Sequence, residues 1–176
     1  MTDEPAIETA RLILRPHRVE DIDGYAPLWT APPQGRSFTP VLDAEAAWAR
    51  LLRLIGHRAV FGFAPSVVTE RGSGRIVGEV GFARFRRGIG PGFDAAPEAM
   101  WIVAREVRGI GYGREAVTAA VARFDACFPV TRSVCMIDPA NTASLRLAAD
   151  LGFTAFGRTT RHGAELVLYE RVAPAS

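Results

Sequence analysis

The chain has 176 residues, enough for one domain with a sizeable core, and its 21 basic and 19 acidic residues nearly cancel. This balance gives no reason to expect nucleic-acid binding. Residues 1–7 lack the apolar core of a signal peptide, and no apolar run approaches the roughly 20 residues that span a membrane. The two cysteines, Cys127 and Cys135, form no C-x-x-C motif, so a cytoplasmic chain with buried free thiols is expected.

The first half of the chain alternates between strand and helix patterns. Apolar spacing predicts a helix over 18–29 and strands over 11–15, 60–69 and 75–85. Asp43 fits the N-cap of a further helix, which Gly56 is expected to end. Prolines and glycines predict loops over 31–40 and 86–97.

The second half continues the alternation. The pattern predicts helices over 115–128 and 141–151 and strands over 98–103, 130–137, 153–158 and 166–172. Gly152 fits the left-handed position that ends a helix, and Phe153 fits the apolar contact that accompanies it.

A glycine-rich turn joins the strand over 98–103 to the helix that follows. Its sequence is Arg108-Gly109-Ile110-Gly111-Tyr112-Gly113-Arg114. Glycines permit positive φ and leave no Cβ in the way of a ligand. The first N–H groups of a helix have no intrahelical partner and carry partial positive charge. The turn therefore predicts an anion site, most simply for a phosphate or pyrophosphate.

Two other phosphate-binding motifs fit this turn less well. All 21 basic residues are arginine, so the lysine that a P-loop requires is absent. The segment from Gly111 to Ala116 fits the dinucleotide fingerprint G-x-G-x-x-A, with Asp138 near the spacing of a ribose-binding acid. Fewer than 70 residues follow Arg108, which is too few to complete a doubly wound dinucleotide domain.

Several motifs in order resemble the GNAT N-acetyltransferases, and in particular the RimJ/RimL-type branch. The run Arg108-Gly-x-Gly-x-Gly113 resembles the acyl-coenzyme A pyrophosphate loop of that family. The opening strand of the RimJ/RimL-type branch is resembled by Thr9-Ala-Arg-Leu-Ile-Leu-Arg-Pro16. Its third strand is resembled by Gly78-Glu-Val-Gly81. Asp138-Pro-Ala-Asn-Thr-Ala-Ser144 and Leu151-Gly-Phe153 resemble the segments around the last long helix.

This resemblance implies an α/β (α+β) fold: a mixed, mostly antiparallel sheet of six or seven strands, flanked by about four helices, as one domain over 1–176. The implied reaction moves an acetyl group from acetyl-coenzyme A to a primary amine in a ternary complex. The acceptor, a protein N-terminus or a small molecule, carries no motif that identifies it. Homodimers are common among such relatives.

The resemblance also assigns the coenzyme A contacts. Backbone donors from Gly109 to Arg114 would hold the pyrophosphate. The pantetheine arm would lie like an extra strand beside Ile102 and Val103, where a backbone N–H can stabilise the thioester oxyanion. Asn141 would hold a pantetheine amide, and it is also a good N-cap for the helix that follows.

The resemblance also points to the catalytic candidates, two for the base and one for the acid. The acceptor amine must lose a proton, so a base is required. Glu98 is the first candidate and Glu79, on the preceding strand, the second; for either, an ordinary ion pair with an arginine is the alternative role. The position of the usual acid, a tyrosine, is occupied by Ala148. Ser144 is the matching substitute, and a thiolate with a pKa of about 8.5 needs little help to leave.

Three alternatives stay open on the sequence alone. Ala148 permits a coenzyme A-binding sensor that has lost catalysis. A dinucleotide oxidoreductase would require a parallel sheet, and a purely structural domain would bind neither ligand. His17, His57 and His162 have no neighbours at metal-ligand spacing, so no metal is expected and all three are interpreted as surface or loop residues.

Overall fold

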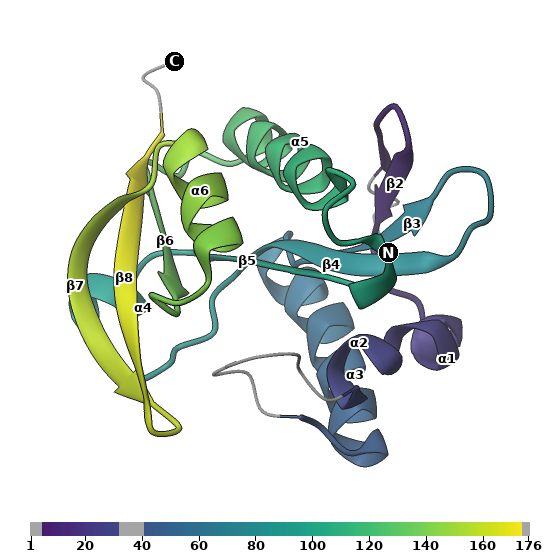
Figure 1. Cartoon of the computed structure of the whole chain (residues 1–176), viewed down its shortest axis with the longest axis horizontal. Helices are drawn as coiled ribbons and strands as arrows, with labels where there is room; N and C mark the ends of the chain where they lie inside the picture. Colours follow the sequence, from purple (N-terminus) through teal and green to yellow (C-terminus); the bar gives the residue numbers. More distant parts are fainter. Residues whose placement is uncertain (1–4, 32–40, 174–176) are drawn as a thin grey trace.

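The protein is described here from a computed structural model that covers residues 5–31 and 41–173. An eight-stranded sheet in the order β1-β2-β3-β4-β5-β6-β8-β7 forms its centre (Figure 1). All neighbouring strands are antiparallel except β5 and β6. This is the mixed, mostly antiparallel class that the sequence predicts, and it contradicts the parallel sheet of the oxidoreductase alternative.

The elements have the following bounds. The strands are β1 (Ile7–Glu8), β2 (Leu12–Arg15), β3 (Ser66–Glu70), β4 (Ile76–Ala83), β5 (Glu98–Val103), β6 (Arg132–Ile137), β7 (Thr154–Arg161) and β8 (Ala164–Val172). The helices are α1 (Ile22–Tyr25), α2 (Pro27–Thr30), α3 (Ala44–Phe61), α4 (Pro91–Asp94), α5 (Tyr112–Cys127) and α6 (Thr142–Asp150). Single turns of 3-10 helix lie at Val19–Asp21 and Arg105–Val107.

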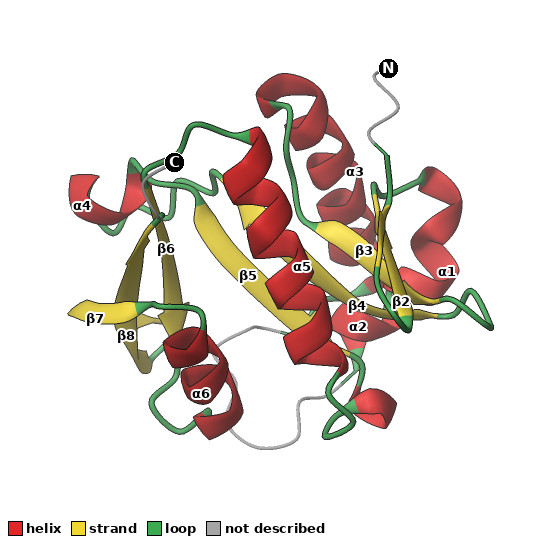
Figure 2. Cartoon of the chain, turned by 90° about the horizontal axis from the view of Figure 1, so that it is seen from above, coloured by secondary structure: helices red, strands yellow, loops and turns green. Residues whose placement is uncertain are grey.

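Helices cover both faces of the sheet. The helices α5 and α6 lie on one face, and α1, α2 and α3 lie on the other (Figures 1 and 2). The main core fills the space beneath α5, where the rings of Phe82 and Phe124 stack with centroids 3.9 Å apart. A smaller core forms around Tyr25, Trp29 and Leu51 on the opposite face. Burial of these apolar side chains supplies the main driving force for assembling the layers.

The N-terminal region differs from the predicted pattern in two places. The sequence predicts six or seven strands, and the structure adds β1 as an eighth. A strand of two residues is too short to show a period-two pattern. The helix predicted over 18–29 is divided into a 3-10 turn, α1 and α2, and α2 begins at Pro27, which lacks the N–H that a continuous helix would use. The loop predicted over 31–40 lies almost entirely outside the described residues.

The prediction that Gly56 ends the second long helix is wrong. Asp43 caps α3 as expected, since its carboxylate accepts a hydrogen bond from the Ala46 N–H at 2.8 Å. The helix then continues through Gly56 and ends at Gly62, which has φ 77°. One glycine inside a helix costs only about 1 kcal/mol, which the buried face of α3 offsets. The strand predicted over 60–69 therefore starts only at Ser66.

Two further boundaries bear on the site. The short helix α4 lies inside the segment that was predicted to be only loop. The helix α5 begins at Tyr112, three residues earlier than the apolar pattern indicates, because the glycines hide its first turn from a periodicity test. The end of the glycine-rich turn is thus already helical. None of the helices in the described ranges is long and apolar enough to cross a membrane.

The strands β5 and β6 diverge at the centre of the sheet. The strand β5 pairs with β4 along the full length of β5, from Glu98 opposite Ala83 to Val103 opposite Gly78. The strand β5 pairs with β6 only at Glu98 opposite Val134. Beyond that pair, one edge of β5 has no neighbouring strand in the described structure.

Candidate active site

A cleft of about 1820 Å³ opens where β5 and β6 separate. Ten of the twelve predicted site residues line it: Glu98, Ile102, Val103, Arg108, Gly109, Gly111, Gly113, Arg114, Asn141 and Ser144. The side chains of the other two point elsewhere. Ile110 is half exposed, and the Tyr112 hydroxyl donates to the Glu70 carboxylate at 3.3 Å. The structure thus gathers residues from β5, the glycine-rich turn and α6 around one space.

The glycine-rich turn has the conformation that an anion site requires. Gly109 and Gly111 have φ of 82° and 89°, in the left-handed region that favours glycine. A Cβ on Gly113 would lie 3.3 Å from the Val103 side chain, so α5 packs closely against β5. Within the described chain, the N–H groups of residues 112–114 find no backbone acceptor, as expected at a helix start. These donors and the helix dipole face the cleft end beside Val103.

A polar clamp that sequence reasoning missed holds the turn in place. The Glu115 carboxylate accepts hydrogen bonds from the Thr9 hydroxyl at 2.6 Å and from the Arg11 N–H and Nε at 2.8 and 2.7 Å. The Arg11 guanidinium also donates to the Ile110 carbonyl at 2.8 Å and lies 4.7 Å from the centroid of the Tyr112 ring.

The clamp has an electrostatic consequence. Burial raises the pKa of Glu115, but the hydrogen bonds from Thr9 and Arg11 outweigh it and hold that pKa below its ordinary value. A charged Glu115 therefore ties the start of β2 to the first turn of α5. The motif at Thr9 indicated a strand, and nothing in its local pattern indicated a contact with a residue more than 100 positions away.

Peptide groups alternate along β5 between its two edges. The Ala104 N–H donates to the Val77 carbonyl at 2.8 Å, and the Val134 N–H donates to the Pro97 carbonyl at 3.0 Å. Even-numbered residues of β5 therefore bond to β4, and odd-numbered ones face the β6 side. Where β6 has diverged, the N–H and C=O groups of Trp101 and Val103 face the cleft.

This alternation separates the two residues predicted beside the pantetheine arm. Val103 presents its peptide groups to the cleft. Ile102 pairs with Glu79 on β4, and its side chain packs against the cluster around Tyr25, Trp29 and Leu51. Trp101 is thus the second residue whose backbone suits an added strand, and sequence reasoning did not identify it because strand spacing alone does not tell which edge is open.

Asn141 and Ser144 lie across the cleft from β5, at the start of α6. The Asn141 side-chain oxygen accepts from the Ser144 N–H at 3.1 Å, which confirms Asn141 as the N-cap. The Ser144 hydroxyl accepts from the Trp101 indole N–H at 3.0 Å. This contact spans the gap between the two diverging halves of the sheet and leaves the Ser144 hydroxyl proton available for a further acceptor.

Glu98 lies at the other end of β5, and it is 5% exposed. Its two oxygens accept from Nε and Nη2 of Arg87, both at 2.8 Å. Arg87 in turn lies 4.2 Å from the centroid of the Phe85 ring. The candidate base is therefore an ion-paired carboxylate in the cleft wall. Arg87, which belongs to the segment predicted as a loop over 86–97, also lines the cleft.

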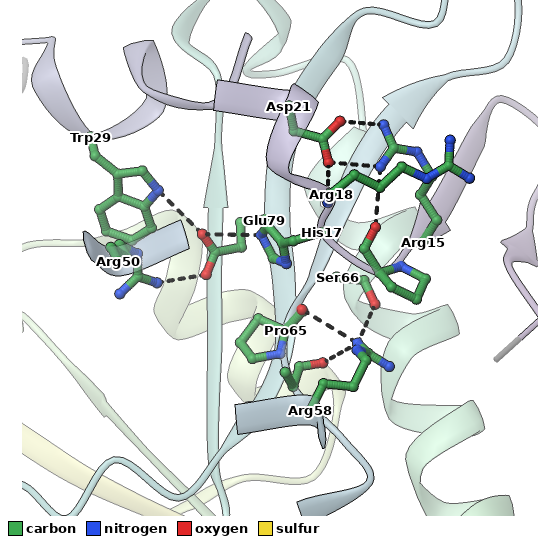
Figure 3. A network of polar contacts seen from close by, with 12 residues as sticks. Arg15, His17, Arg18, Asp21, Trp29, Arg50, Arg58, Pro65, Ser66 and Glu79 are labelled. Atoms are coloured by element: carbon green, nitrogen blue, oxygen red, sulfur yellow. Dashed lines mark hydrogen bonds and ion pairs between the residues drawn. The ribbon is translucent and has the colours of Figure 1, made fainter. Parts of the chain in front are cut away.

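Glu79, the second candidate base, is fully buried. Figure 3 shows its carboxylate among Arg50, Trp29 and His17. Its carboxylate accepts from Nη2 of Arg50 at 2.6 Å and from the Trp29 indole N–H at 3.2 Å. The Arg50 guanidinium stacks 3.7 Å from the centroid of the Trp29 ring. Arg50 and Trp29 line the cleft, whereas Glu79 does not. Glu79 thus orients two residues of the wall.

The same cluster contains His17, which lies in the loop between β2 and the first 3-10 turn. His17 is 7% exposed, its Nε2 lies 3.9 Å from the Glu79 carboxylate, and its ring packs edge-on against Tyr25. Burial lowers the pKa of His17, only partly opposed by the charge of Glu79, and burial raises the pKa of Tyr25. The interpretation of His17 as a surface or loop residue is thus right about the loop, but the side chain is buried.

The structure also shows where His57 and the two cysteines lie. His57 lies in α3, where its Nδ1 contacts the Phe63 carbonyl at 2.7 Å and its Nε2 accepts from the Arg84 N–H at 2.9 Å. Cys135 is buried beside the cleft, but Cys127 is exposed, contrary to expectation. In the ranges that the structure describes, no cluster of His, Cys, Asp or Glu suits a metal ion.

Comparison with known proteins places the chain in a family. The sequence model described as the acetyltransferase (GNAT) domain matches residues 11–154. A protein from Bordetella pertussis assigned to the GnaT-family acetyltransferases has a similar structure, with a TM-score of 0.88 and 34% identity over 96% of this chain and 100% of that one. Among curated protein sequences, none matches this chain at a significant level.

More distant structures share the fold. The ribosomal-protein-S5-alanine acetyltransferase from Vibrio fischeri has a TM-score of 0.74 and 20% identity over 97% of both chains. RimL, a ribosomal L7/L12 alpha-N-protein acetyltransferase solved with coenzyme A, has a TM-score of 0.78 and 17% identity over 98% of this chain and 100% of that one. The chain therefore belongs to the GNAT family and is an acetyltransferase, with RimJ/RimL-type enzymes among its structural relatives.

Proposed function

We propose that this chain, acting as one domain over 1–176, moves the acetyl group of acetyl-coenzyme A directly to a primary amine in a ternary complex. One observation carries the proposal above the others. The open edge of β5 runs from the uncapped start of α5 toward Glu98, so a phosphate-anchored, amide-bearing chain fits along it. GNAT acetyltransferases use acetyl-coenzyme A, and this geometry suits that co-substrate.

The proposed coenzyme A contacts follow the cleft from one end to the other. Backbone donors between Gly109 and Arg114, those of Ile110 and Tyr112 included, hold the pyrophosphate, and Arg108 and Arg114 add charge. The pantetheine amides pair with the open peptide groups of Trp101 and Val103. The Asn141 carboxamide, whose N–H groups are not needed for capping, donates to a pantetheine carbonyl.

The proposed chemistry is nucleophilic acyl substitution. The amine nitrogen forms a bond to the thioester carbonyl carbon, and an N–H of β5 stabilises the oxyanion that forms. Glu98 accepts the amine proton, directly or through a water molecule. The C–S bond then breaks, and the Ser144 hydroxyl donates a hydrogen bond or a proton to the departing sulfur. Direct transfer needs no covalent intermediate on the protein.

The acceptor enters from the side of α1, α2 and α3, which forms the wall opposite the turn. Two of the structural relatives act on ribosomal proteins, so a protein N-terminus is one class of acceptor and a small-molecule amine the other. A homodimer and a cytoplasmic location also stay predictions. Ala148 is fully buried in the core and lies outside the cleft lining, so it neither supplies an acid nor blocks one.

Amine-dependent release of coenzyme A tests this function. The purified chain is mixed with acetyl-coenzyme A and a panel of peptides and small amines, thiol release is followed, and each product is weighed by mass spectrometry. We expect a product heavier by one acetyl group on nitrogen for at least one acceptor. Tight binding of acetyl-coenzyme A without acetylation of any amine would support the sensor alternative instead.

A further inference from the structure

The charged residues that line the cleft are strongly unbalanced. Nine arginines line it, against three acidic residues, Glu98, Glu106 and Asp138. Four of these arginines lie near the turn and α6: Arg105, Arg108, Arg114 and Arg146. The phosphate groups of coenzyme A together carry roughly four negative charges. The co-substrate can therefore balance the arginines at its own end, where Arg114 also pairs with Asp150. The ninth arginine, Arg75, pairs with Glu70 at 3.1 Å.

The other end holds four arginines that coenzyme A does not reach in this arrangement: Arg50, Arg53, Arg87 and Arg161. Two of them have carboxylate partners, since Arg50 binds Glu79 at 2.6 Å and Arg87 binds Glu98 at 2.8 Å. Two positive charges are left over at this end.

Neither leftover arginine has an acidic partner in the described part of the chain. Arg161 donates to the backbone carbonyl of Arg87 at 3.0 Å. The Arg53 guanidinium lies 5.9 Å from the centroid of the Phe85 ring. The Arg87 guanidinium lies over the same ring, at 4.2 Å. The segment 32–40 contains no aspartate or glutamate in its sequence. The surplus charge is thus a property of this end of the cleft.

The surroundings of Arg53 are correspondingly unfavourable for a cation. Burial beside the cleft and the positive charges of Arg50 and Arg87 lower the pKa of Arg53. Like charges held close together repel one another, and a counter-charge relieves that repulsion. An anion from the acceptor would supply it here.

We infer that the acceptor is an amine that also carries a carboxylate, bound by Arg53 with Arg161 as the second cation. The inference rests on the proposed acetyl transfer. A polyamine or another polycationic acceptor is repelled by this end of the cleft. A carboxylate fits better than a phosphate dianion, because Glu98 lines the same end and repels the larger negative charge.

The same charges favour the reaction itself. Neighbouring cations stabilise the neutral form of an amine and thereby lower its pKa. The carboxylate anchors the acceptor, and the arginines assist the loss of the amine proton that Glu98 accepts. An arginine-rich acceptor end is therefore compatible with a base that is already ion-paired.

The test uses pairs of amidated peptides that differ only by Asp or Asn at the first, second or third residue, plus phosphoserine at the same places. At the best position, wild type should acetylate the Asp peptide about 10- to 100-fold faster in kcat/KM than the Asn peptide, the range of a charge-assisted hydrogen bond. Arg53→Gln should bring this ratio close to one and leave the KM of acetyl-coenzyme A unchanged. Arg158→Gln, an exposed arginine outside the cleft, should keep the ratio.

A second measurement does not depend on turnover. N-acetylated Asp and Asn peptides are titrated into the chain in the presence of coenzyme A, and the Asp product should bind more tightly to wild type only. Equal rates and equal binding for Asp and Asn at every position would overturn the inference, as would a preference that survives in Arg53→Gln or a stronger preference for phosphoserine. Acetylation of all peptides without preference would leave the proposed function intact, whereas failure of acetyl-coenzyme A to bind would remove it.

Discussion

The carboxylate of Glu98 and the guanidinium of Arg87 meet in a two-point ion pair, with both N–O distances at 2.8 Å. The pair fixes the direction of the Glu98 oxygens at the acceptor end of β5. Arg87 is therefore a positioning residue for the candidate base, and the unpaired lone pairs of Glu98 are the ones that can take a proton.

Glu98→Gln should lower kcat by about 10²- to 10⁴-fold, the usual contribution of a general base, with little change in the KM of acetyl-coenzyme A. Glutamine keeps the shape of the side chain but cannot accept the amine proton. Steady-state kinetics over a range of pH measures this, with Glu165→Gln, from an exposed ion pair on β8, as the matched control. A wild-type kcat in Glu98→Gln would remove Glu98 from the mechanism.

Ser144→Ala should slow transfer by about tenfold or less and not abolish it. A thiolate with a pKa of about 8.5 leaves with little help near neutral pH, so the hydroxyl is useful rather than essential. The substitution also removes the acceptor of the Trp101 indole N–H. The control is Ser73→Ala, in the exposed turn between β3 and β4. Complete loss of activity with an intact fold would mean that Ser144 has a larger chemical role.

Gly111→Ala should weaken acetyl-coenzyme A binding and destabilise the chain by about 1–2 kcal/mol, the cost of a side chain in the left-handed region. Gly111 has φ 89°, and an added Cβ would lie 3.2 Å from Nη2 of Arg11, inside the clamp that holds the turn. Calorimetry measures both effects. Gly72→Ala is the control, because an added Cβ there meets nothing within 4 Å. Equal acetyl-coenzyme A affinity in Gly111→Ala and Gly72→Ala would show that the glycine-rich turn does not bind acetyl-coenzyme A.

Glu79→Gln should lower the free energy of unfolding by about 3–5 kcal/mol, because Arg50 would keep a buried charge without its partner. The control Glu165→Gln breaks the exposed ion pair with Arg158 and should lower the free energy of unfolding by about 0–1 kcal/mol. Urea unfolding of both variants gives the comparison. If the two losses were similar, the buried cluster around Glu79 would not stabilise the wall of the cleft.

His17 predicts a loss of stability in mild acid. Its folded-state pKa is lowered by burial, so the unfolded chain binds the proton first and the folded state loses stability as pH falls below the ordinary value of about 6.5. Burial also lowers the pKa of His57, so His57 changes the stability in the same direction. The loss of stability from each histidine is complete only at a pH below its folded-state pKa. Asp21, with a lowered pKa, contributes the same sign only at much lower pH.

Melting temperatures at pH 7.5 and 5.5 measure this effect. The difference between the two should be smaller in His17→Gln than in wild type and unchanged in His162→Gln, a variant of the exposed turn between β7 and β8. An identical difference in wild type and His17→Gln would show that His17 does not titrate in this window.

Local patterns were enough to predict most of the fold. Period-two alternation marks β2, and the apolar stripe marks α5, because each element buries one face. The errors came from tertiary effects: Gly56 sits inside α3 because packing offsets its cost, and β1 exists only through its pairing with β2. Propensity alone cannot weigh these contributions.

The site was predictable where it is local in sequence. The turn from Gly109 to Arg114 and the cap at Asn141 carry their own signals. The clamp between Arg11 and Glu115, and the pair between Arg87 and Glu98, join segments that only the folded sheet brings together. His17 likewise lies beside Glu79, more than 60 positions away in the chain. No spacing rule contains such contacts.

Thermal unfolding with acetyl-coenzyme A, with NAD as the control ligand, tests the assignment of the turn most directly. At about 100 times its dissociation constant, acetyl-coenzyme A should add roughly 2.7 kcal/mol to the free energy of unfolding and raise the melting midpoint clearly, while NAD should not. No rise with acetyl-coenzyme A, or a rise with NAD alone, would contradict an acyl-coenzyme A site between the glycine-rich turn and the open edge of β5.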